Sequence, residues 1–163
     1  MRIALVAAVA GVTAGLSGLA HAAPAAVSVT IDPELQAKAA KVYGVRDVHS
    51  LATELRSEVE RELARTGAYQ DTRVELILVD AKPNRPTMKQ LGDTPNLDSR
   101  SVSVGGARIG GRIVAPDGRV TPVGYQDYSV NLREVIATGV WSDADATIQR
   151  FAHRLARGHP DGH

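Results

Sequence analysis

The clearest pattern of apolar and polar positions in the chain lies between residues 48 and 65 and predicts a helix. Apolar residues recur there three and four positions apart, namely Val48, Leu51, Ala52, Leu55, Val59 and Leu63. This spacing places them on one face of a helix, while charged residues such as Arg56 and Glu60 take the other face. Asp47 is expected to cap the start of this helix, and Gly67 to end it.

Two segments on either side of this helix predict strands. Residues 27–31 alternate apolar and polar side chains, which is typical of a half-buried strand. Residues 72–81 contain the apolar run 76–79, which is typical of a strand in the middle of a sheet. After the first strand, Asp32 and Pro33 resemble the start of a short helix that Gly44 ends.

Residues 100–115 predict a third strand whose apolar positions change phase. The valines before residue 105 are even-numbered, whereas the isoleucines after it are odd-numbered. Such a change of face requires a β-bulge, and we expect it at Gly105 and Gly106. Beyond the bulge, Arg108 and Arg112 then share the outward face. Residues 116–119 predict a tight turn, and residues 120–130 return as the hairpin partner.

The last pattern predicts a second amphipathic helix that begins near Ser142. Ser142 and Asp145 have the spacing of a capping box, and Gly158 ends the apolar stripe. The order of elements therefore predicts an α+β fold, with an antiparallel or mixed sheet of about four strands and helices packed on one face. We expect the core to contain Leu51, Leu55, Val59, Leu76, Leu78, Ile109, Phe151 and Leu155.

The amino-terminal residues predict export. A basic start, an apolar run of small residues and the pattern Ala20–His21–Ala22 are typical of a signal peptide that is cleaved after Ala22. We expect residues 1–22 to be removed, residues 23–158 to form a single domain and residues 159–163 to be a flexible tail. The chain has no Cys, so lipid attachment at a lipobox is excluded. The mature protein is expected in the periplasm or outside the cell, with no stable membrane anchor.

Charge and composition narrow the possible partners. Without Arg2, 18 basic residues balance 18 acidic ones, which argues against the basic footprint of a nucleic-acid-binding protein. The chain has only six aromatic residues, so a large stacking surface for sugars or bases is not expected.

A long loop is the strongest candidate for a binding site. Residues 82–99 exceed the usual length of a connection and contain three prolines. We expect the binding residues to be three cations of this loop and two of the following strand, namely Lys82, Arg85, Lys89, Arg108 and Arg112. Their charge predicts an acidic protein or another anionic partner of the cell envelope. We expect no cofactor, no metal and no catalytic residue.

Other polar groups are candidates for metal binding or catalysis. The carboxyl-terminal group His153, His159, Asp161 and His163 matches no closed zinc pattern, and Asp93, Asn96 and Asp98 lack the pattern of an EF-hand. The acidic pairs Asp143/Asp145 and Glu58/Glu62 are expected on solvated helix surfaces. The leading interpretation is a non-catalytic binding or assembly module of the envelope. The alternatives are a secreted enzyme, metal-dependent or hydrolytic, and a secreted protease inhibitor.

The same elements carry a family resemblance. The exported start, the helix 48–65 followed by strand 72–81, the hairpin strand 109–114, and residues 141–144 opening a helix that contains Phe151 resemble small exported bacterial envelope domains. Many of these are lipoproteins, related in architecture to the TolB amino-terminal domain and the curli-export lipoprotein. The resemblance implies a role in envelope assembly or binding and implies no catalytic residue.

Overall fold

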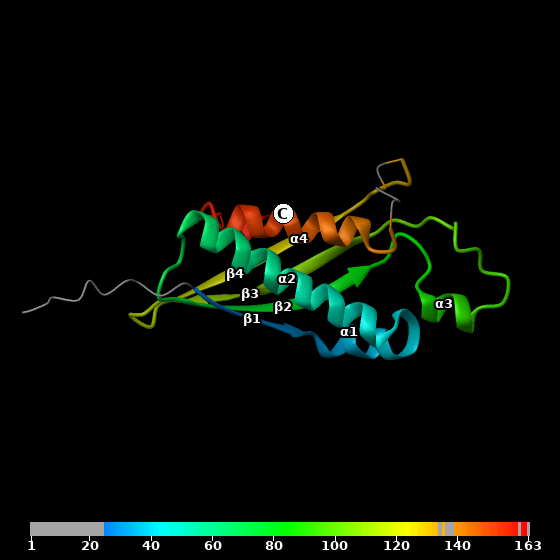
Figure 1. Ribbon diagram of the computed structural model, residues 1–163, viewed down its shortest axis with the longest axis horizontal. Coiled ribbons are helices and arrows are strands. Elements are labelled where there is room, and N and C mark those ends of the chain that lie inside the picture. Colours follow the sequence, from blue (N-terminus) through cyan, green and yellow to red (C-terminus); the bar gives the residue numbers. More distant parts are fainter. Residues whose placement is uncertain (1–24, 134, 136–138, 160, 163) are drawn as a thin grey trace, which may run out of the picture.

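The computed structural model describes residues 25–133, 135, 139–159 and 161–162; the expected signal peptide lies outside the described residues. A sheet carries helices on one of its faces (Figure 1). In chain order the elements are β1 (Ala26–Ile31), α1 (Pro33–Lys38), the π-helix η1 (Ala39–Tyr43), α2 (Val45–Thr66), β2 (Arg73–Lys82), α3 (Met88–Asp93), β3 (Gly106–Val114), β4 (Val120–Tyr128), α4 (Ser142–Leu155) and β5 (Asp161–Gly162).

The sheet is mixed and follows the order β1-β2-β3-β4-β5. β1 is parallel to β2, and β3 is antiparallel to both of its neighbours, β2 and β4. These four strands confirm the expected α+β fold. Within the segment expected as a flexible tail, the two residues of β5 pair with Gly124 and Tyr125 of β4.

The core lies between the sheet and the two long helices, α2 and α4, which lie side by side on one face (Figure 1). All eight side chains expected in the core are at most 2 % exposed. Phe151 of α4 contacts Tyr125 of β4, with 6.2 Å between the ring centroids. No helix of the described residues covers the other face of the sheet (Figure 1), so its outward side chains are accessible in this part of the chain.

Helix α2 confirms the expected amphipathic pattern but begins earlier than expected. Gly44, whose φ is 103°, precedes the first residue, Val45, and Asp47 lies within the first turn. Asp47 therefore does not cap the helix as expected. Gly67 ends it as expected, since its φ of 69° is left-handed and its N–H donates to the carbonyl of Leu63.

The phase change before β3 has a different cause from the bulge expected at Gly105 and Gly106. β3 begins only at Gly106, and the sheet's irregularity lies on β2, between Leu78 and Asp80. Gly106 is required at the strand start, because its φ is 144° and a Cβ there would lie 2.2 Å from the carbonyl oxygen of Asp127. The residues before it are irregular, so their even-numbered valines do not belong to the strand.

The tight turn between β3 and β4 is confirmed. The N–H of Ala115 donates to the carbonyl of Arg119, and the N–H of Arg119 donates to the Asp117 carboxylate. In the described part of the chain, no helix combines the length and the apolar character needed to cross a membrane.

Candidate functional site

The uncovered face of the sheet, which we call the open face, carries three of the five expected binding residues. Arg108 and Arg112 lie four positions apart on one side of β3, and both are exposed, as expected. Glu75 lies opposite Arg112 on β2, and Asp80 lies opposite Arg108. Lys82 follows Asp80 on the same side of β2 and is also exposed. The fold therefore brings Lys82, Arg108 and Arg112 onto one surface.

The open face has an excess of positive charge. On the four long strands its charged side chains are basic at four positions and acidic at two, namely Arg73, Lys82, Arg108 and Arg112 against Glu75 and Asp80. Glu75 lies 2.6 Å from Arg112 and 3.6 Å from Arg73. Arg108 forms no ion pair with the described residues, so its guanidinium is available to a partner.

An aromatic ring marks one end of the open face. The Lys82 ammonium lies 5.1 Å from the centre of the Tyr128 ring, and the Tyr128 hydroxyl donates to Asp80 at 3.1 Å. Lys38 of α1 forms a 2.8 Å ion pair with the same carboxylate. Burial, followed by the negative charge of Asp80, raises the pKa of Tyr128 well above its ordinary value. The tyrosine therefore remains a neutral hydrogen-bond donor at physiological pH.

Arg85 and Lys89 lie on the connection between β2 and β3, away from the strands. Arg85 is half-buried and its backbone N–H donates to the carbonyl of Val140. Lys89 belongs to α3 and forms a 2.7 Å ion pair with Asp93. The five expected residues thus divide between the open face and the connection.

The connection is more ordered than its sequence indicates. Residues 82–99 were expected to be irregular, but they contain α3, which begins with a capping box formed by Thr87 and Gln90. The sequence pattern predicted a capping box at Ser142 instead. There Trp141 is the N-cap, and the Ser142 hydroxyl exchanges hydrogen bonds with Gly139.

A buried polar cluster, which sequence reasoning missed, anchors this connection. Asn84 is fully buried, and its Nδ2 donates to the Asp143 carboxylate at 2.7 Å and to the carbonyl of Ser103 at 3.3 Å. Its Oδ1 accepts from the N–H of Asp143 at 2.8 Å. The Ser129 hydroxyl donates to the same carboxylate at 2.6 Å. The cluster therefore joins four segments of the chain.

The acidic residues of the long helices are less solvated than expected. Asp143 is only 6 % exposed and Glu58 only 8 % exposed. Burial raises the pKa of Asp145 to about 7, and the charge of Glu54 and a hydrogen bond with it act in the same direction. The expectation of surface carboxylates was therefore wrong for Asp143 and Glu58. The sequence pattern does not reveal this burial, because it arises where Glu54 and Asp145 meet between two packed helices.

The carboxylates considered for metal chemistry have other partners. Asp93 pairs with Lys89, and Asp98 accepts the backbone N–H of Arg100 at 2.8 Å. Among the residues that the structure describes, no three His, Asp or Glu side chains are close enough to hold a metal ion.

Comparison with known proteins yields a distant structural likeness. No protein-family model matches the chain, and no curated protein sequence matches it. The structure of a minor lipoprotein from Acinetobacter baumannii is similar, with 9 % identity and a TM-score of 0.35 over 82 % of this chain and 90 % of that chain. At that distance we base the functional proposal on the residues of this chain alone.

Proposed function

We propose that the protein is a non-catalytic binding module of the bacterial cell envelope that holds an acidic protein surface on its open face. The observation that supports this proposal is the placement of four basic side chains against two acidic ones on one uncovered side of the sheet. Charge of one sign on a flat surface speeds encounter with a partner of the opposite sign and fixes its orientation.

The apolar residues between the charges favour a protein as the partner. Ile77 is 39 % exposed and Val120 is 52 % exposed. Tyr128 adds an aromatic ring at the end of the same surface. Arginine and tyrosine are enriched in protein interfaces, where apolar area supplies binding energy and charge supplies specificity. The envelope location rests on the sequence of the export signal and is part of the proposal.

Site-specific photocrosslinking in living cells tests the proposal. A photoreactive residue at Ile77, in the middle of the open face, is expected to capture a partner, which mass spectrometry identifies. The matched control is the same residue at Ser57, which is exposed on α2. Arg108→Glu together with Arg112→Glu should reduce capture about tenfold, because two attractive charges become repulsive. Arg157→Glu, beyond the end of α4, should leave it unchanged.

Two outcomes would contradict the proposal. The first is capture at Ser57 equal to that at Ile77. The second is capture at Ile77 that survives the charge reversal while the variant remains folded. Increasing salt should weaken the purified complex, because the Debye length falls to about 8 Å at physiological ionic strength.

A further inference from the structure

The free edge of β1 is a second surface that the proposed function leaves unused. Among the strands of the described residues, β1 pairs only with β2 and stands at the end of the sheet. The N–H of Ala26 donates to Thr72 and the N–H of Asp32 donates to Leu78, so even-numbered residues direct their backbone groups toward β2. Residues 27, 29 and 31 therefore direct theirs toward the free edge.

This edge lacks the features that protect edge strands from pairing. Natural proteins place charged residues, proline or bulges on exposed edges to prevent strand addition. β1 has the sequence AVSVTI, with no charge and no proline, and its pairing with β2 is continuous. One backbone carbonyl on the free edge already has a partner, since Gln36 Nε2 donates to the carbonyl of Ile31 at 3.0 Å. The backbone N–H and C=O groups of Val27 and Val29 remain available for pairing within the described structure.

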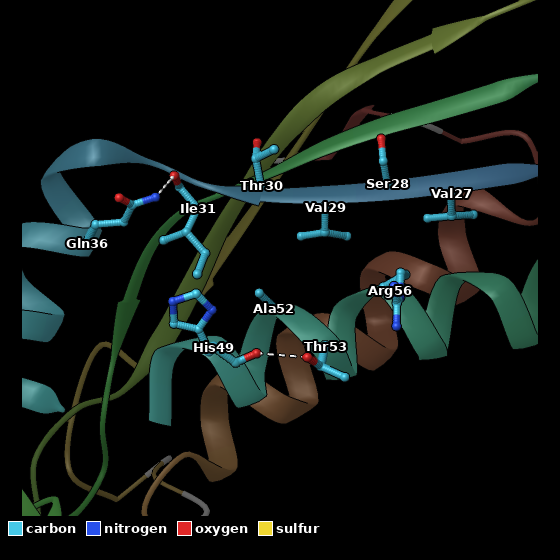
Figure 2. A pocket seen from close by; sticks show the side chains of 10 residues that line it. All are labelled: Val27, Ser28, Val29, Thr30, Ile31, Gln36, His49, Ala52, Thr53 and Arg56. Carbon is cyan, nitrogen blue, oxygen red and sulfur yellow. Dashed lines mark hydrogen bonds between the residues drawn. The ribbon is translucent and has the colours of Figure 1, made fainter. Parts of the chain in front are cut away.

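A groove runs along the same edge, between β1 and α2. Figure 2 shows Val27, Val29 and Ile31 pointing from β1 toward α2, while Ser28 and Thr30 point to the other side. His49, Thr53 and Arg56 follow one side of α2 beneath the strand (Figure 2). The hollow they line has a volume of about 490 Å³. A second hollow continues it past Val27 toward Glu60 and Ala64 of α2.

We infer that the edge of β1 binds an extended segment of a partner protein, which adds to the sheet as a further strand and places alternate side chains in the groove. In this mode of recognition the backbone hydrogen bonds give affinity and the pockets for alternate side chains give specificity. The side chains of β1 that point toward α2 are those of Val27, Val29 and Ile31, which are apolar, so small apolar side chains fit beside them. Arg56 lines the groove, and its side chain is half exposed and pairs with Glu60 only at 3.9 Å, so an acidic side chain of a partner fits beside it.

The position of α2 excludes a second copy of this chain as the occupant. α2 packs against β1 along its length and lies beneath it in Figure 2. A two-fold pairing of β1 with its own copy would bring the two α2 helices to about one strand spacing, ~4.8 Å. Packed helix axes lie about 8–10 Å apart, so the helices would collide. A single extended segment carries no such helix, so it pairs with the edge of β1 beside α2 without a collision.

A synthetic peptide and backbone amide exchange test this inference. The probe has seven residues, with valine at its second and sixth positions, aspartate at its fourth and threonine elsewhere. The amides of Val27, Val29 and Ile31 should exchange rapidly in the free protein and at least tenfold more slowly with saturating peptide. Those of Ser28 and Thr30 should be protected in both states, because they bond to β2. A probe with lysine in place of aspartate should bind about fivefold more weakly.

Two variants separate edge pairing from simple loss of fold. Val29→Pro removes an N–H that points away from β2, so β1 keeps its ladder while peptide binding falls about tenfold. Val29→Ala is the matched control, since it shortens the same side chain but keeps the N–H, and it should bind within about threefold of the wild type. If Val29→Pro does not fold, amide exchange of the wild-type protein decides alone.

Three results would overturn the inference. The first is peptide binding with a Kd weaker than about 1 mM. The second is protection without alternation along β1. The third is a Val29→Pro variant that is folded and binds the peptide normally. A free protein that sediments as a dimer with Val29 already protected would also overturn it. Reversing the charges of Arg108 and Arg112 should leave peptide binding at this edge unchanged. Failure of the edge inference is therefore distinguishable from failure of the proposed function.

Discussion

Asn84 directs both polar atoms of its side chain into the protein. The amide nitrogen binds Asp143 and Ser103, and the amide oxygen accepts from the backbone of Asp143. Gly105 gives the amide its space, because a Cβ there would lie 2.6 Å from the Asn84 side chain. One residue thereby fixes the segment after β2, the segment before β3 and the start of α4.

Replacing Asn84 by alanine should destabilise the protein by roughly 3 kcal/mol or more, because the buried Asp143 carboxylate loses a donor and several backbone groups lose partners. Chemical denaturation measures the free energy of unfolding. Asn131→Ala is the control, since Asn131 is exposed and its side chain accepts a local N–H from Arg133. Equal losses in the two variants would show that the buried cluster does not hold the connection.

Sequence reasoning could not find Asn84, for a physical reason. An asparagine between prolines is typical of a turn, and its real partner, Asp143, lies 59 positions away. The same limit applies to Asp143, which at a helix start is typically solvated. The local sequence pattern indicates which backbone conformation a residue prefers. Whether a polar side chain is buried depends instead on which distant segment packs against it.

Helices α2 and α4 pack side by side on the sheet and share an acidic pair, Glu54 and Asp145. Burial and the charge of Glu54 raise the pKa of Asp145 to about 7, and burial also raises the pKa of Glu54. Glu58, one turn further along α2, adds negative charge near Glu54 and itself pairs with Arg61. The two helices therefore approach more favourably when Asp145 holds its proton.

The free energy of unfolding should consequently fall as the pH rises from about 4 to about 7. The folded state binds the Asp145 proton more tightly than the unfolded state, whose carboxyl has a pKa near 3.8, so stability present at low pH is lost through the folded pKa. Asp145→Asn should reduce this slope, leaving the part that comes from Glu54, and exceed the wild type by about 1 kcal/mol at pH 8, a value reduced for solvent screening. Denaturation at several pH values, with Asp93→Asn as control, measures the difference. Parallel curves for wild type and Asp145→Asn would contradict the prediction.

Periodicity predicted whole elements better than their ends. The stripe of α2 was long enough to place the helix, because its apolar side chains meet the sheet at every turn. The start of β3 was misplaced, since valines in an irregular segment had the alternation of a strand. The capping box was expected at Ser142 and occurs at Thr87, because both places have the required spacing. Which candidate side chain turns inward is decided by tertiary packing.

The molecule as a whole is asymmetric about its sheet. The helices cover one face, and the open face carries the excess of basic residues. Beyond the end of the strands, α3 projects on the connection between β2 and β3 (Figure 1). No side chain of α3 is buried, whereas Asn84 and Thr87 before it are fully buried. The connection therefore has an anchored base and an exposed outer part.

Removing the outer part should leave the fold intact. Replacement of residues 88–98 by a short Gly-Ser linker should lower the free energy of unfolding by less than about 1 kcal/mol, because it removes little buried apolar surface. A deletion that begins at Asn84 should be far more damaging. Denaturation of both variants makes the comparison. A loss above about 2 kcal/mol for the first deletion would show that α3 belongs to the core.

The parallel pairing of β1 with β2 also bears on the order in which the chain folds. β3 and β4 are joined by a short turn, so they meet at small cost in chain entropy. β1 can pair with β2 only after the intervening chain, which forms α1, η1 and α2, has brought β2 beside it, since Ala26 pairs with Arg73. Contacts between such distant positions form slowly. The strand made first along the chain is thus the one that joins the sheet late, and until it does, β2 is itself the free edge.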